Sequence, residues 1–132
     1  MGTFSVEIQI GNQETGEFLQ LEALVDTGST YTLLPSEMLN CLGIKIVDQR
    51  DFELADQRSV RYDVGEARLR LNGNELTVLV VYAPEGTSPL LGATALELFG
   101  LAAEPVNQRL IPVPALLKSM CPSTVNDESG IN

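Results

Sequence analysis

Apolar and polar residues alternate along most of this chain with the two-residue period of half-buried strands. The alternation is unbroken in residues 4–10 and returns in residues 60–71. Residues 17–25 begin in the same way but become fully apolar toward their end, as expected of a strand that enters a core. Turn residues separate these runs at 11–16 and 72–74. The pattern therefore predicts antiparallel hairpins.

The remaining segments are shorter and complete a mainly β chain. Residues 35–39 and 94–99 have the composition of short helices, the second of which ends at a glycine. Residues 42–47 and 75–82 predict two further strands, and residues 110–111 predict a final one. The expected fold class is all-β with one or two short helices.

The sequence predicts one domain followed by a tail. At 132 residues and 44% hydrophobic content, the chain is long enough for a single modest core. We expect the domain to cover residues 1–115. Residues 116–132 are mostly polar and have no period, so we expect a flexible C-terminal tail there.

One predicted loop carries a carboxylate in an apolar setting. The apolar residues 23–25 end abruptly at Asp26, and Thr-Gly-Ser follows at once. Glycine permits a tight turn after a strand, and the hydroxyls can hydrogen-bond the carboxylate or the loop backbone. Asp-Thr-Gly is also ordinary turn chemistry, and Glu-Thr-Gly at 14–16 reads as a plain hairpin loop in polar surroundings. Because Leu33 and Leu34 follow, we expect Asp26 to lie in the interior.

The composition excludes several kinds of chemistry. The chain has no histidine, which removes Ser-His and Cys-His nucleophilic mechanisms. Its two cysteines, Cys41 and Cys121, make poor metal ligands without partners, so we expect no metal and no cofactor. A carboxylate glycosidase is disfavoured because aromatic residues are only 5% of the chain. Any hydrolytic chemistry must then depend on carboxylates.

Charge and hydropathy bear on partners and location. The net charge of −10 argues against nucleic acid and anionic membranes, because a phosphate surface would repel this protein. The longest apolar run, residues 78–83, is far too short to cross a bilayer. The first residues lack the basic region and apolar core of a signal peptide. We therefore expect a cytoplasmic protein.

The sequence resembles the aspartic proteases of the retroviral type, the retropepsins and their cellular and bacterial relatives. The resemblance rests on Val-Asp-Thr-Gly-Ser-Thr at 25–30 and on Leu-Leu-Gly-Ala at 90–93. It is completed by the segment 101–113, which contains Pro-Val-Asn-Gln-Arg-Leu, and it covers roughly residues 4–114. It implies a retropepsin-like closed acid-protease barrel and an aspartic endopeptidase activity.

This chemistry implies two chains. It needs two carboxylates that share one proton, since a pair about 3 Å apart cannot both ionise near neutral pH. None of the other aspartates is followed by Thr-Gly or Ser-Gly, so each chain supplies only Asp26. A two-fold axis would place Asp26 opposite its own copy. We therefore predict a homodimer that acts on peptides or unfolded protein, with residues 2–4 and 109–113 as further interface strands.

The resemblance also assigns roles around the acid. It implies that Thr27 reaches across to the partner loop and that Gly28 gives backbone access to substrate. Ser29 can donate a hydrogen bond to the outer carboxylate oxygen. It further implies that the hairpin within residues 52–71 is a flap that closes over bound peptide. The predicted substrate-binding residues, in the flap tip and the second motif, are Ala55, Asp56, Gln57, Arg58, Ser59 and Leu91.

Two departures from the family pattern leave an alternative open. Flap tips in the family are commonly glycine-rich, whereas no glycine lies between Gly43 and Gly65. Ala93-Thr94 stands where many viral members have a charged residue that helps to tie the site together. The alternative is a catalytically weak or inactive module of the same fold, which dimerises or binds peptides without cutting them.

Overall fold

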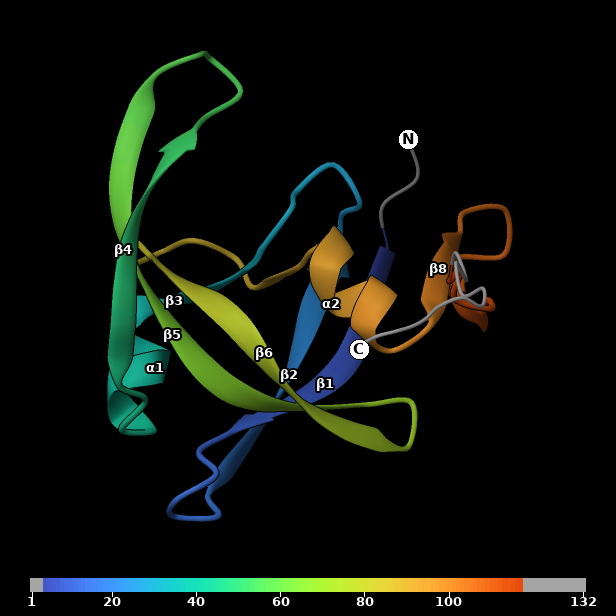
Figure 1. Cartoon of the computed structure of the whole chain (residues 1–132), viewed down its shortest axis with the longest axis horizontal. Helices are drawn as coiled ribbons and strands as arrows, with labels where there is room; N and C mark the ends of the chain where they lie inside the picture. Colours follow the sequence, from blue (N-terminus) through green and yellow to red (C-terminus); the bar gives the residue numbers. More distant parts are fainter. Residues whose placement is uncertain (1–3, 118–132) are drawn as a thin grey trace, which may run out of the picture.

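A computed structural model describes residues 4–117, which form nine strands and two short helices (Figure 1). In chain order these are β1 (Phe4–Gly11), β2 (Phe18–Val25), β3 (Thr32–Pro35), α1 (Ser36–Cys41), β4 (Ile46–Glu53), β5 (Ser59–Leu71), β6 (Asn74–Ala83), β7 (Leu90–Leu91), α2 (Ala93–Leu98), β8 (Leu101–Glu104) and β9 (Arg109–Pro112). The mainly β class with two short helices is confirmed.

Seven strands form one sheet that closes on itself. Their order is β1-β2-β7-β3-β6-β5-β4, and β1 also pairs with β5. The closure joins Gln9, Ile10 and Gly11 to residues 68–70 in antiparallel register. The long strand β5 makes this possible, because one part of it pairs with β4 and the other with β1 and β6. Strands β8 and β9 pair only with each other, in a separate small sheet.

The hydrophobic core lies inside the closed sheet. Successive side chains of a strand point to opposite faces, so every second side chain points into the closed sheet. Ile8, Ile10, Leu34, Leu69 and Leu91 are among the side chains that are almost completely buried. Each such side chain contributes about 1.5–3 kcal/mol through removal of apolar surface from water. The core therefore holds together the strands that lead to the Asp26 loop.

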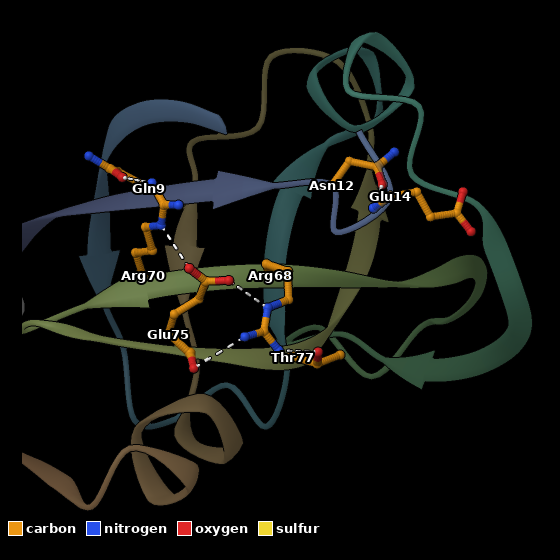
Figure 2. A network of polar contacts seen from close by, with 7 residues as sticks. All are labelled: Gln9, Asn12, Glu14, Arg68, Arg70, Glu75 and Thr77. Carbon is orange, nitrogen blue, oxygen red and sulfur yellow. Dashed lines mark hydrogen bonds and ion pairs between the residues drawn. The ribbon is translucent and has the colours of Figure 1, made fainter. Parts of the chain in front are cut away.

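Polar side chains on the outside connect the strands where the sheet closes (Figure 2). Arg70 donates to Glu75 at 2.9 Å and to the amide oxygen of Gln9 at 3.1 Å, which joins β5 to β6 and β1. Arg68 donates to the same carboxylate at 2.8 Å and to the hydroxyl of Thr77 at 2.8 Å. The hydrogen bonds from Arg70 and Arg68 hold the pKa of Glu75 below its usual value of 4.5.

The strand predicted at 42–47 is wrong in its bounds. Helix α1 runs to Cys41, and a turn at Gly43, with φ at 73°, separates it from β4, which begins only at Ile46. The amide of Asn12 donates to the carbonyl oxygens of Leu42 and Gly43, at 2.9 and 3.2 Å, and fixes this turn. Buried apolar residues on either side of Gly43 produced an alternating pattern without a strand.

Neither helix within residues 4–117 is long and apolar enough to span a bilayer. The predicted tail at 116–132 lies outside the described residues, except for Leu116 and Leu117, which are exposed. The predicted domain boundary therefore stays a prediction.

Candidate active site

The Asp26 loop begins where β2 leaves the closed sheet. Val25 is almost fully buried and pairs with Leu91 of β7 in parallel register. The amide of Asp26 donates to the carbonyl of Leu91 at 3.0 Å, which continues the ladder by one residue. The carboxylate then accepts from the amide of Gly28 at 2.9 Å. The acid is thus held at the end of a strand by backbone groups on both sides.

Asp26 is less buried in the protomer than the sequence predicted. It is half-buried, and Thr27 and Gly28 are exposed. The apolar flanks do reach the core, since Val25 and Leu34 are buried. The loop lies between the end of β2 and the start of β3, and its apolar neighbours in the sequence do not cover it.

Gly92 brings a second segment against this loop. A Cβ at Gly92 would lie 2.3 Å from the carbonyl oxygen of Tyr31 and 2.8 Å from that of Ser29. Only a residue without a side chain permits so close an approach. The amide of Gly92 donates to the hydroxyl of Thr32, a fully buried polar side chain, at 3.1 Å. The second motif therefore supports the loop through its backbone.

Residues after Gly92 continue this support. The amide of Ala93 donates to the carbonyl of Ser29 at 2.7 Å. The amide and the hydroxyl of Thr94 both donate to the carbonyl of Thr30, at 3.0 and 2.7 Å. Thr94 therefore ties the site together at the position where many viral relatives were expected to use a charged residue. Sequence reasoning had left this question open.

The hydroxyl of Ser29 does not contact the Asp26 carboxylate, contrary to expectation. It donates instead to the carbonyl of Tyr31 at 2.9 Å. The bond that the carboxylate does accept comes from the amide of Gly28. The side chain of Ser29 thus stabilises the loop backbone.

A hairpin built from β4 and β5 rises beside the loop, and its tip stands away from the closed sheet (Figure 1). The tip is closed by two hydrogen bonds between Leu54 and residues 57 and 58, at 2.8 and 2.9 Å. Gln57 has a left-handed backbone, with φ at 70°, where glycine is usual. Asp56 accepts from the amide and the guanidinium of Arg58, and these bonds lower the pKa of Asp56. The glycine-free tip is therefore a well-formed turn.

A cleft of about 480 Å³ lies between the loop and the hairpin. Its floor includes Leu33 and Val81, and its loop side runs from Gly28 to Tyr31. Its hairpin side runs from Asp51 to Ala55 and includes the aromatic side chain of Tyr62. This volume is in the range of pockets that hold small molecules or peptide side chains.

The structure brings together some of the predicted binding residues and separates others. Ala55 lines the cleft, while the tip residues 56–59 are exposed and do not line it in this conformation. Leu91 is fully buried in the core and is not part of the cleft wall, because its side chain points into the closed sheet. Its contribution to the site is the carbonyl that accepts from Asp26.

Sequence reasoning missed the aromatic residues of the cleft. Tyr31, Phe52 and Tyr62 all line it and are all half-buried. They are three of only seven phenylalanines and tyrosines in the chain. The one signal in the sequence was that aromatic residues are scarce, which makes each of the few present a candidate for binding.

Comparisons with known proteins agree with this geometry. The protease of simian foamy virus (mac), a solution structure, superimposes with a TM-score of 0.52 at 19% identity, covering 73% of this chain and 94% of that one. EIAV protease complexed with the inhibitor HBY-793 gives a TM-score of 0.54 at 18% identity, covering 74% and 88%. No curated protein matches the sequence. At these identities the structural likeness shows the fold alone.

A sequence comparison with protein families identifies the family as well as the fold. The model described as gag-polyprotein putative aspartyl protease matches residues 6–97. The match includes the Asp26 loop, the hairpin beside it and the Gly92 segment, and it spans most of the chain. This chain therefore belongs to the gag-polyprotein aspartyl protease family and has the fold of the retroviral proteases.

Proposed function

We propose that this chain is one half of a homodimeric aspartic endopeptidase that cuts peptides or unfolded protein segments. The observation that carries the proposal is the position of Asp26. Its carboxylate accepts from the amide of Gly28, its own amide donates to the carbonyl of Leu91 at the end of β2, and its loop forms one side of a cleft. The sequence provides one such loop per chain.

The chemistry of the proposed enzyme requires two copies of Asp26. One carboxylate is charged and takes a proton from a water held between the pair, while that water attacks the peptide carbonyl. The other is protonated and donates to the oxyanion that develops. The titration then belongs to the pair of carboxyl groups. The Gly28 amide, which donates to one oxygen of Asp26, orients the carboxylate for this role.

Exposed groups in the protomer support a two-fold assembly. Thr27 and Gly28 are exposed beside the half-buried acid, so a partner loop could reach them. Phe4 pairs with Val25, which places the start of β1 next to the Asp26 loop. Five of the nine large hydrophobic residues that are exposed among residues 4–117 lie between Leu98 and Leu117. A dimer that covered this segment would remove unusual apolar surface from water.

Two measurements test the proposal. Sedimentation equilibrium of the purified protein should give twice the chain mass, and a strict monomer would overturn the dimer. Denatured casein should be cleaved by the wild type between pH 3 and 7 and not by Asp26→Asn. Glu14→Gln is a matched control, because Glu14-Thr15-Gly16 repeats an acid-Thr-Gly sequence in an exposed loop. Equal cleavage by wild type and Asp26→Asn would refute the assignment.

A specific observation favours a second candidate, a dimerisation or peptide-binding module with little catalysis. The hydroxyl of Ser29 is used by the Tyr31 carbonyl and is not available to the acid. In that case the protein would be a dimer that binds peptides without cutting them. Fluorescence anisotropy of labelled casein fragments would then show binding, and no fragment would be cleaved. The Asp26→Asn variant would then bind as well as the wild type.

A further inference from the structure

The seam between β1 and β5, where the seven-stranded sheet closes, is short. It pairs residues 9–11 with residues 68–70, whereas β1 pairs with β2 along its whole length, from Phe4 to Gly11. The two strands diverge on either side of the seam, and hollows of about 370 and 170 Å³ lie there. The backbone therefore holds β1 less firmly to β5 than to β2.

Three charged side chains hold the seam together on the outside of the sheet (Figure 2). The carboxylate of Glu75, on β6, accepts from Arg68 at 2.8 Å through one oxygen and from Arg70 at 2.9 Å through the other. Arg70 also reaches across the seam. It donates to the side-chain oxygen of Gln9 at 3.1 Å, and its guanidinium lies 3.5 Å from the ring centroid of Phe18. We call Arg68, Glu75 and Arg70 the clasp.

The clasp depends on the negative charge of Glu75. Arg68 and Arg70 are alternate residues of β5, so their side chains leave the same face of the sheet and place two positive charges side by side. The carboxylate between them offsets their repulsion, and both hydrogen bonds to it are charge-assisted. With Glu75 neutral, the two guanidinium groups would repel each other, and the contacts of Arg70 across the seam would weaken.

Acid removes the charge on Glu75. The hydrogen bonds from Arg70 and Arg68 hold the pKa of Glu75 below its usual value of 4.5. The stabilisation that the clasp gives is therefore complete above pH 4.5 and is lost as the pH falls through the lowered pKa. Both arginines stay charged throughout this range.

Other charged groups face the same part of the sheet without joining the clasp. Those that line the two hollows are Glu7, Glu14, Lys45 and Glu66. Glu7 lies opposite Glu22 of β2 and accepts from Gln20 at 2.5 Å, while Glu14 pairs with Lys45 at 3.6 Å. Within residues 4–117, no hydrogen bond or ion pair connects these groups to the clasp. Glu7, which shares the larger hollow with Glu75, is thus a reference for a nearby carboxylate outside the clasp.

We propose that the clasp is an acid-sensitive switch, which opens the seam between β1 and β5 when Glu75 is protonated and leaves the pairing of β1 with β2 intact. The difference in the length of the two ladders is the reason that one opens before the other. The switch bears on the proposed enzyme because the hairpin that it releases carries Asp26 at the end of β2. It does not depend on catalysis.

The strand register identifies the amides that report the opening. The amide of Asn12 donates to the carbonyl of residue 17, at 2.9 Å, in the hairpin that joins β1 to β2. Because bonding alternates along an antiparallel ladder, the even-numbered amides of β1 face β2 and the odd-numbered ones face β5. Gln9 and Gly11 are therefore the reporter amides of the seam, and Ile8 and Ile10 are reference amides in the same strand.

Hydrogen exchange of these four amides, followed by NMR at pH 7 and pH 2.5 and corrected for intrinsic rates, tests the switch. In the wild type, acid should lower the protection of the reporter amides about tenfold relative to the reference amides, as expected for the loss of two exposed ion pairs near the upper end of their usual strength. Glu75→Gln should have the lower protection already at pH 7 and no further change in acid. Glu7→Gln removes the same charge from the same hollow and should behave as the wild type.

Three results would overturn the inference. One is a ratio of reporter to reference protection that is the same at both pH values in the wild type. Another is an equal loss at all four amides, which is global unfolding. The third is a Glu75→Gln variant that is as well protected as the wild type at pH 7. If circular dichroism shows that Glu75→Gln is not folded, the wild-type comparison decides. Exchange is measured without substrate, so a failure to cleave casein would refute the proposed function and leave this result unaffected.

Discussion

Replacing Gly92 by alanine tests whether the close approach of two backbones fixes the Asp26 loop. The added Cβ would lie 2.3 Å from the carbonyl oxygen of Tyr31, 2.5 Å from its carbonyl carbon and 2.8 Å from the carbonyl oxygen of Ser29. Ordinary contact begins at 3.4 Å, so the segments must separate by about 1 Å. All three atoms belong to the main chain and cannot turn aside as the end of a side chain could.

The energetic cost follows from what that separation breaks. Hydrogen bonds of 2.7, 3.0 and 3.1 Å connect residues 92–94 to the loop and to Thr32. A shift of about 1 Å removes at least two of them, at roughly 0.5–1.5 kcal/mol each, in addition to about 1–3 kcal/mol for overpacking. Relaxation elsewhere absorbs part of this, and we expect Gly92→Ala to lower the free energy of unfolding by about 2–4 kcal/mol.

Urea titration measures this difference as a lower midpoint at an unchanged slope. The matched control is Gly86→Ala, where the new Cβ meets nothing within 4 Å and the cost is only that of a left-handed backbone with φ at 88°, about 1–2 kcal/mol. Gly92 has φ at −95° and carries no such strain. If Gly92→Ala is no more destabilised than Gly86→Ala and still cleaves casein, the close approach does not fix the loop.

Three further variants test other parts of the molecule. Gln57→Gly relieves a left-handed backbone that costs about 1–2 kcal/mol and adds about 0.5–1 kcal/mol of chain entropy to the unfolded state, so thermal denaturation should show a gain in stability of up to about 1.5 kcal/mol. A loss of stability would contradict the turn geometry. The Tyr82 hydroxyl donates to the buried carbonyl of Ile44 at 2.7 Å, so Tyr82→Phe should cost about 1–3 kcal/mol in urea, and a neutral effect would argue against this bond. The pKa of Glu75 is below its usual 4.5, so its ion pairs stabilise the fold above pH 4.5 and are lost as the pH falls through the lowered pKa. Glu75→Gln should therefore be less stable than the wild type at pH 7. A difference in stability that persists under strongly acid conditions would refute the pairing.

The sequence could predict those parts of the site that depend on local pattern. The strand that leads to Asp26, the turn after it and the hairpin tip near Asp56 follow from periodicity and turn residues, which act over a few positions. Only the two ends of strand β4 fell within predicted strands, because its middle residues 48–51 are exposed and polar and show no alternation. Whether the Ser29 hydroxyl donates to the Asp26 carboxylate or to the carbonyl of Tyr31 depends on distances that no local pattern contains.

The sequence could not predict the cleft, because the cleft depends on contacts between distant segments. Tyr31 and Phe52 meet only because β4 pairs with β5 in one particular register and the loop is pressed against Gly92. Both conditions bring together residues that are distant in the chain. Leu91 was assigned to the pocket for the same reason, since burial inside a closed sheet is a property of the whole fold.

The support of the Asp26 loop by main-chain groups has a consequence for how this protein can vary. The amides of residues 92–94 and the carbonyls of residues 29 and 30 carry most of the bonds, and every amino acid except proline supplies the same groups. Saturation mutagenesis should therefore find Ala93 permissive, whereas Gly92 and Thr32, which act through a missing or a buried side chain, should accept almost no replacement. The geometry around the acid can persist while much of the surrounding sequence drifts.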